Sequence, residues 1–150
     1  MRHSKWLPFA CLSLIGTVVL TAQSPKPYRT RLSPVPLDVS MQATVAGSGS
    51  ATAVLTGTRL AVTGTFEGLK SPPTIAQIHK SPIRGVRGPS VLDLTLAKTD
   101  AASGTISGSF DLTPIQVADL EKGRLYVQLH SEKAPDGNLW GWLLPQENKR

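Results

Sequence analysis

Residues 124–130, RLYVQLH, alternate apolar with polar or aromatic side chains, which is the period of a β-strand. The two faces of such a strand carry different side chains: Leu125, Val127 and Leu129 on one, and Tyr126, Gln128 and His130 on the other. A second alternating stretch, residues 138–144, follows a segment rich in turn-forming residues, 131–137. We therefore predict a hairpin whose Leu and Val face belongs to the core.

The same period of about two recurs along the chain upstream of this hairpin. We predict further strands at residues 39–45, 50–55, 59–66, 75–79, 91–96 and 105–112. Residues 56–58, TGT, predict a tight turn between two of these strands.

One helix is predicted over residues 113–123. Thr113 and Gln116 have the spacing of a capping box, Pro114 suits the first helical position, and Gly123 is typical of a helix end. Together, the predicted strands and this helix indicate an all-β fold, an antiparallel β-sandwich or Greek-key-like barrel of about eight strands with one short helix.

Residues 1–22 are expected to be a signal peptide. Basic residues precede an apolar run at residues 7–20, and small or polar residues place a cleavage site near Ala22 or Gln23. The run is shorter than the roughly 20 residues of a membrane-spanning helix. We expect a secreted or periplasmic protein with no transmembrane segment in the mature chain, and retention of the run as a short anchor is the alternative.

The remaining chain divides into three predicted parts. Residues 23–37 are expected to be a Pro-rich basic linker that packs no core, residues 38–145 the β domain, and residues 146–150 a polar tail.

The composition narrows the classes of function. Cys11 is the only cysteine and lies in the predicted signal peptide, so the mature domain offers no disulfide and no thiolate ligand. The net charge of +6 falls to +4 when Arg2 and Lys5 are removed, a scattered excess that does not favour nucleic-acid binding. The sequence contains no nucleophile elbow, HExxH motif or phosphate-binding loop. We therefore do not expect an enzyme.

Residues 57–144 carry an ordered set of short motifs. They are VTGTFEGL at 62–69, AQIH at 76–79, VLDL at 91–94, GTISGSF at 104–110, LYVQLH at 125–130 and APDGNLWG at 134–141. In this order they resemble the CHRD (chordin-type) domain, which also occurs in exported bacterial proteins. The resemblance implies an extracytoplasmic module with no established enzymatic activity. Gln77 stands where members of this family usually have the first histidine of an A-H-I-H strand, which weakens any metal site implied there.

Two histidines, His79 and His130, follow the predicted signal peptide, and each ends a predicted strand. If the two strands are neighbours, the imidazoles could bind copper or zinc, with Glu132 or Asp136 as a third ligand. The alternative is that both are structural residues held by hydrogen bonds, with no cofactor bound. Their separation decides, because rings more than about 10 Å apart cannot share an ion with bonds of about 2 Å.

If the sequence numbers of directly opposed residues in the hairpin add up to an even number, even-numbered residues of both strands share one face. This face then carries four side chains: Tyr126, Gln128, Trp140 and Trp142. This face is either covered by another part of the chain or exposed as a platform for a partner, since large apolar patches usually mark contacts. An unknown protein, peptide or carbohydrate at the cell envelope is the expected partner in the second case.

A loop after the 75–79 strand gathers Lys80, Arg84 and Arg87, which could bind an anion or could be solvated. Asp119 is expected on the surface of the helix. The leading hypothesis is a non-enzymatic, extracytoplasmic binding or structural module that acts through the aromatic and histidine face. A copper or zinc protein using His79 and His130, and an accessory subunit of an exported redox or envelope complex, are the alternatives.

Overall fold

The structure, a computed structural model, describes residues 23–146 and contains nine strands, one α-helix and one short 3-10 helix in that range. The predicted signal peptide and the end of the predicted tail lie outside the described residues. The elements in chain order are β1 (Lys26–Pro34), η1 (Met41–Ala43), β2 (Ser48–Thr56), β3 (Arg59–Glu67), β4 (Pro73–Lys80), β5 (Ser90–Lys98), β6 (Gly104–Asp111), α1 (Pro114–Glu121), β7 (Leu125–Ser131), β8 (Ala134–Trp142) and β9 (Leu144–Pro145).

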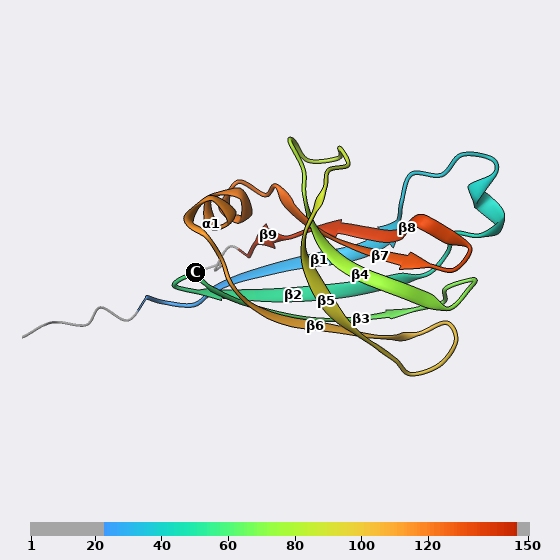
Figure 1. The fold of residues 1–150 in the computed structure, drawn as a ribbon, viewed down its shortest axis with the longest axis horizontal. Helices are drawn as coiled ribbons and strands as arrows, with labels where there is room; N and C mark the ends of the chain where they lie inside the picture. The colour runs from blue at the N-terminus through green and yellow to red at the C-terminus, as the bar shows by residue number, and fades with distance from the viewer. Residues whose placement is uncertain (1–22, 147–150) are drawn as a thin grey trace, which may run out of the picture.

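Eight of the strands close into an antiparallel barrel in the order β1-β2-β3-β6-β5-β4-β7-β8, and β9 extends the seam beside β1 (Figure 1). The predicted hairpins are confirmed, with β2 paired to β3 through the Gly57 turn and β7 paired to β8. Tyr126 lies opposite Trp142 and Gln128 opposite Trp140, as the even residue sum predicts. The barrel form of the predicted all-β fold is therefore the one that the chain adopts.

Alternation places one face of each strand inside the barrel. Leu125, Val127 and Leu129 are fully buried there, in one cluster with apolar residues of the other strands. Burial of this kind is the main favourable term in folding. The expected apolar face of the 124–130 stretch is therefore the core face.

The barrel closes where β8 returns to β1, and this seam is short. Ser33 pairs with Trp140 and Pro34 with Leu139, while most of β1 is paired to β2 on its other side. At Gly141 the two backbones approach so closely that a Cβ atom would overlap Thr30 Oγ1 and the Arg31 carbonyl oxygen. Only glycine fits at this point of the seam.

The prediction of a linker at residues 23–37 is wrong for the part that forms β1. Tyr28, Thr30 and Leu32 alternate inward and are buried, so the barrel begins at Lys26 rather than near residue 38. The prolines that favoured a linker stand before the strand or near its ends, where a missing N–H group costs little.

The strand predicted at residues 39–45 is also wrong. The Asp38 carboxylate accepts hydrogen bonds from Ser40 Oγ at 2.6 Å and from the Met41 amide at 3.0 Å, which bends the chain into η1. Val39 is 87% exposed as a result. Local hydrogen bonds of an Asx turn have overridden the alternating pattern.

The helix forms within its predicted bounds as α1, and the Thr113–Gln116 capping box is present. Its Leu120 enters the core. Asp119, expected on the surface, is buried, and its carboxylate pairs with Lys80 Nζ at 2.7 Å and Arg124 Nη1 at 3.7 Å. Within residues 23–146, the chain forms no helix with the length and apolar character needed to cross a membrane.

Replacement of Gly141 by alanine tests the closure of the barrel. Because the added Cβ would force β1 away from β8, we expect Gly141→Ala to lower the free energy of unfolding by about 1–3 kcal/mol. Urea denaturation measures this change. Ser107→Ala, on the exposed face of β6, is the control and is expected to change stability by less than about 0.5 kcal/mol. A Gly141→Ala protein as stable as the wild type would contradict this seam.

Candidate functional site

The outer faces of β4, β7 and β8 carry a continuous row of rings. Neighbouring members have ring centroids 4.7 to 6.0 Å apart, and the row consists of His130, His79, Tyr126, Trp142 and Trp140. The row includes both histidines and three of the four side chains predicted to share the hairpin face. The structure therefore brings the two predicted sites together.

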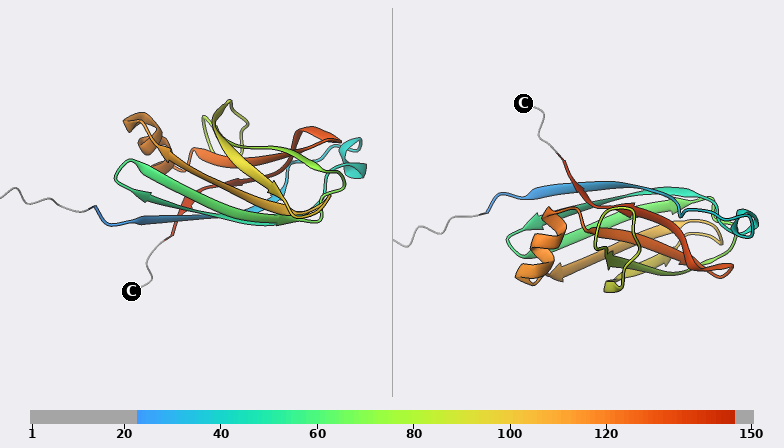
Figure 2. Two further views of the ribbon diagram at one scale, coloured as in Figure 1. Left: turned by 60° about the horizontal axis from the view of Figure 1, so that its bottom comes forward. Right: turned by 90° about the horizontal axis from the view of Figure 1, so that it is seen from above.

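The loop from β4 to β5, residues 81–89, projects from the barrel (Figure 2). Its Gly88 backbone contacts two rings of the row, Tyr126 and His79. The Gly88 amide donates to Tyr126 Oη at 3.1 Å, and Tyr126 Oη lies 3.3 Å from the Gly88 carbonyl oxygen to which it donates. Ser81 Oγ donates to the Ile83 and Val86 carbonyls inside the loop. Tyr126 is thereby fully buried although it points away from the barrel.

Gln128 is also buried, and its amide Nε2 donates to the Asp136 carbonyl oxygen at 3.0 Å. Of the two alternatives for the four-residue face, cover by another part of the chain is therefore the one found at Tyr126 and Gln128. Trp140 and Trp142 are half-buried and keep part of their surface open. The 81–89 loop contacts Tyr126, and the Asp136 backbone at the start of β8 contacts Gln128. The loop contact is tertiary, and the hairpin sequence contains no signal for it.

Both imidazoles are fixed by backbone carbonyl groups. His79 Nδ1 lies 2.9 Å from the Gly88 oxygen, and His130 Nδ1 lies 2.7 Å from the Pro135 oxygen. Because a carbonyl oxygen only accepts, each Nδ1 carries the proton and each Nε2 keeps a free lone pair. Both Nε2 atoms are buried and have no hydrogen-bond partner among the residues that the structure describes.

The two histidine rings lie close enough to act together, with centroids 6.0 Å apart and planes inclined by 31°. Burial lowers the pKa of His79, the hydrogen bond to Gly88 opposes this, and the electrostatic interactions with His130 and Arg87 lower the pKa further. His79 is therefore neutral at pH 7, the form in which histidine binds metals.

No third metal ligand joins the pair within residues 23–146, where no group of three His, Cys, Asp or Glu side chains is arranged to hold an ion. Glu132 and Asp136, the expected third ligands, are exposed. Gln77 is also engaged elsewhere, since its Nε2 donates to Asp93 Oδ1 at 2.7 Å. A zinc site with its usual four ligands has no support here.

The three cations of the predicted anion loop have different surroundings. Lys80 pairs with Asp119, whereas Arg87 donates to the Asp136 carbonyl and its guanidinium lies 5.9 Å from the Trp140 ring centroid. Arg84 lines a groove of about 300 Å³ on the β1–β8 seam. Lys80 and Arg87 are therefore directed to different partners.

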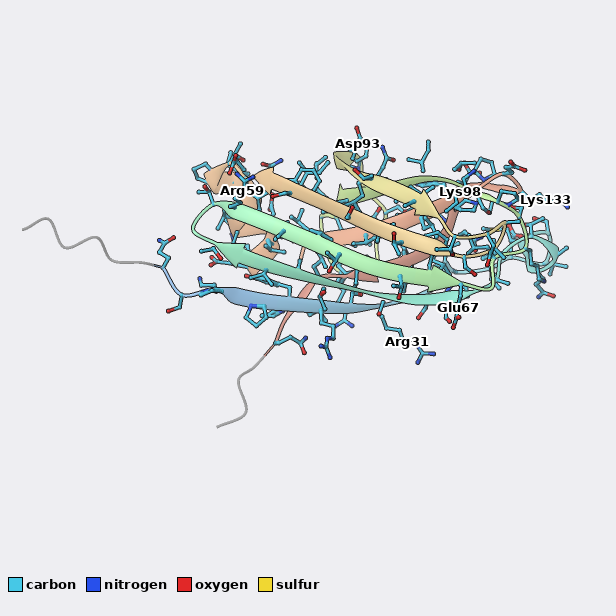
Figure 3. All side chains as sticks on the ribbon, turned by 90° about the horizontal axis from the view of Figure 1, so that it is seen from below. Arg31, Arg59, Glu67, Asp93, Lys98 and Lys133 are labelled. Atoms are coloured by element: carbon cyan, nitrogen blue, oxygen red, sulfur yellow. The ribbon has the colours of Figure 1, made fainter. Side chains whose placement is uncertain are left out.

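This groove, the Trp–Arg groove, combines two indole rings with three guanidinium groups: Trp140, Trp142, Arg29, Arg31 and Arg84. Figure 3 shows Arg31 pointing away from the barrel at the β1 edge. Trp142 Nε1 is buried without a hydrogen-bond partner in the described part of the chain. The sequence did not suggest Arg29 and Arg31, because they lie in the segment taken for a linker.

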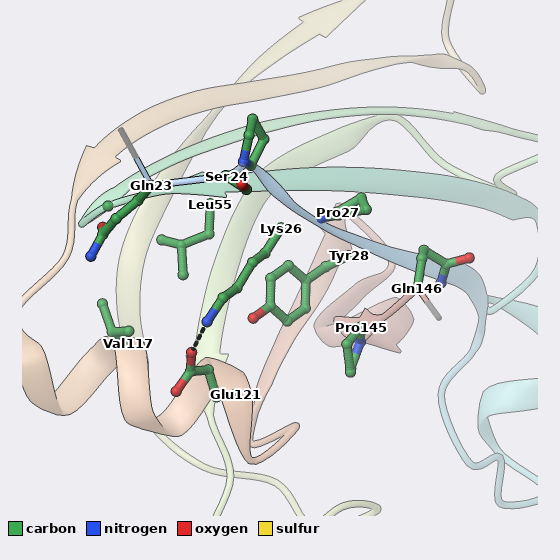
Figure 4. Close-up of a pocket in the computed structure, with 12 residues that line it drawn as sticks. Gln23, Ser24, Lys26, Pro27, Tyr28, Leu55, Val117, Glu121, Pro145 and Gln146 are labelled. Atoms are coloured by element: carbon green, nitrogen blue, oxygen red, sulfur yellow. Dashed lines mark hydrogen bonds and ion pairs between the residues drawn. The ribbon is translucent and has the colours of Figure 1, made fainter. Parts of the chain in front are cut away.

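A larger hollow of about 560 Å³ lies at the end of the barrel near α1 (Figure 4). Tyr28, Leu55 and Val117 line it, and Lys26 Nζ pairs with Glu121 Oε1 across it at 2.6 Å. Because these two charges neutralise each other, the Trp–Arg groove is the better candidate for binding an ion or a charged ligand.

The comparisons with known proteins give one finding. The family model described as CHRD domain matches residues 29–143. Comparison with curated proteins and with solved structures gives no match. The matched range runs from β1 to the residue before β9, so it covers the whole ring row and the seam.

Removal of the Tyr126 hydroxyl tests whether the 81–89 loop is tied to the ring row. Tyr126→Phe loses the hydrogen bonds to Gly88, so we expect the free energy of unfolding to fall by about 1–2 kcal/mol. Tyr28→Phe is a matched control, because the Tyr28 hydroxyl has no hydrogen bond within residues 23–146 and faces the hollow (Figure 4). Chemical denaturation compares the two. Equal stability of the two variants would contradict a stabilising role of the hydrogen bonds between Tyr126 and Gly88.

Stability should depend on pH through His79. Since its folded pKa is below the ordinary value of 6.5, the unfolded chain binds the proton more readily, and stability falls as pH decreases below about 6.5. The loss continues down to the folded pKa. Denaturation at a series of pH values between about 7.5 and 5 measures it. In His79→Gln the slope over this range should be smaller, and an unchanged slope would rule out His79 as its origin.

Proposed function

This chain belongs to the CHRD domain family, and we propose that it is an extracytoplasmic binding module that holds an acidic carbohydrate in the Trp–Arg groove. The family is in general one of non-catalytic modules of the extracellular type. The single observation that carries the proposal is the convergence of two half-buried indoles with three arginines on the β1–β8 seam.

The arginines supply the charge for an anionic ligand. Within residues 23–146, the salt bridges involve Lys26, Arg59, Lys80 and Arg124, and none involves the groove arginines. A guanidinium without an internal partner can form paired hydrogen bonds to a carboxylate or sulfate group. The groove therefore supports an acidic ligand over a neutral one.

The indoles supply an apolar surface for a ring-shaped ligand. Trp140 and Trp142 are in edge contact, with centroids 4.7 Å apart, and Trp142 is stacked on Tyr126. Because Tyr126 is held by Gly88, both indoles are kept in place before a ligand arrives. Rigid aromatic faces bind the apolar face of a sugar ring at a low entropic cost. This combination favours a uronic acid or sulfated sugar over an extended peptide.

Titration with oligomers of a uronic acid, followed by tryptophan fluorescence, tests the proposal, and neutral dextran oligomers provide the comparison. We expect saturable binding of the acidic oligomer that weakens at high salt, and none of the neutral one. Arg31→Ala should raise the Kd by about three- to tenfold. Arg59→Ala, whose guanidinium pairs with Asp111 on another side of the barrel, should leave the Kd unchanged.

Trp142→Ala should abolish binding, and circular dichroism shows whether that variant still folds. The arginine variants keep the test valid if it does not. Equal binding of the acidic and neutral oligomers, or unchanged affinity in Arg31→Ala and Arg29→Ala together, would refute the proposed ligand class.

A further inference from the structure

The free lone pairs of His79 and His130 are not explained by the Trp–Arg groove. His79 is 8% exposed, both Nε2 atoms are buried, and neither has a partner in the described part of the chain. Buried polar atoms are nearly always hydrogen-bonded, so two neighbouring exceptions need a cause. The 6.0 Å between the ring centroids suits a shared ion, because two imidazoles bound through Nε2 at about 2 Å in a nearly linear arrangement have centroids about 6 Å apart.

We propose that the Nε2 atoms of His79 and His130 bind one monovalent copper ion, Cu(I), between them. The site is separate from the Trp–Arg groove and does not depend on the ligand proposed for it. The same chemistry would accept Ag(I), which has the same charge and the same filled d shell.

The number of ligands selects the ion. Zn²⁺ takes about four ligands, and Cu(II) prefers a square arrangement of nitrogen and oxygen atoms, but within residues 23–146 no third His, Cys, Asp or Glu side chain joins the two imidazoles. A d¹⁰ monovalent ion is stable with two neutral nitrogen ligands in a nearly linear arrangement. Charge favours the same ion, because Arg87 lies near His79 and a buried double charge without a carboxylate would be costly.

The surroundings hold both rings in the orientation that binding requires. The Gly88 and Pro135 carbonyls fix the Nδ1 protons, as outer hydrogen bonds do for histidine ligands of metals. Tyr126 stacks on His79 with centroids 5.1 Å apart and planes inclined by 24°. The Gly88 carbonyl thus orients a ligand while its residue anchors the 81–89 loop over the site.

A buried water that donates to both Nε2 atoms is the competing explanation. A histidine NMR titration distinguishes the two in the wild-type protein. On addition of one equivalent of Ag(I), we expect both Nε2 resonances in long-range ¹H–¹⁵N spectra to shift and both Nδ1 atoms to keep their protons. If neither Nε2 resonance shifts, the proposal is overturned and a bridging water explains the two lone pairs. A shift of one histidine alone also overturns the shared site.

Competition with a chromogenic Cu(I) chelator, under anaerobic conditions with ascorbate, measures affinity and stoichiometry. We expect one Cu(I) per chain, and a loss of affinity of at least about tenfold in both His79→Gln and His130→Gln. Gln77→Ala, on the same strand, is the matched control and should bind as the wild type does. Retention of stoichiometric Cu(I) in the double His79→Gln, His130→Gln variant, or equally tight binding of Zn²⁺, would overturn the proposal.

The proposed Cu(I) site and the proposed ligand of the Trp–Arg groove can be tested independently. Arg31→Ala should weaken the acidic oligomer without changing the Cu(I) affinity, and His130→Gln should do the reverse. A parallel loss of both in Arg31→Ala would show that the copper site is not separate from the groove, which would contradict the proposal as stated.

Discussion

The close approach of the Gly88 backbone to β4 and β7 determines what the outer face of this barrel can do. Its carbonyl oxygen accepts from both His79 and Tyr126, and its amide donates to Tyr126. A Cβ atom at residue 88 would overlap the Lys80 carbonyl oxygen, so only glycine permits the approach. Without it, the 81–89 loop would lose its anchor, and the rings beneath would be solvated and free to rotate.

The consequence is a barrel with two buried layers on one side. β7 shows this most clearly, because five consecutive residues, Leu125 to Leu129, are buried, although the side chains alternate between the core and the outer face. The inner layer provides most of the stability through apolar burial. The outer layer contains the polar and aromatic groups, and its partial cover leaves one side open as the Trp–Arg groove. Binding functions thus sit on a rigid scaffold, which lowers the entropic cost of holding a ligand.

Local rules predicted the parts of the fold that depend on neighbours in sequence. The 124–130 alternation, the Gly57 turn and the Thr113–Gln116 capping box all formed as expected. Prediction failed at β1 because distant contacts decide there: β2 and β8 provide the pairing partners of the proline-rich segment. It failed at residues 39–45 for a local reason, because the hydrogen bonds of the Asp38 turn replaced the alternating strand. The burial of Tyr126 depends on a loop that begins more than 30 residues upstream in the chain. Sequence could pair the histidines as candidates, but their separation and the absence of a third ligand within residues 23–146 required the fold.

Two backbone carbonyls fix the rings of His79 and His130, each with a proton on Nδ1. The tautomers of both histidines in the metal-free protein at neutral pH, read from ¹⁵N chemical shifts of the ring nitrogens, test this arrangement most directly. We expect an amine-type Nδ1 that exchanges its proton slowly and an imine-type Nε2 in each ring. Protons on Nε2, or shifts averaged over both tautomers as in a solvated imidazole, would contradict it.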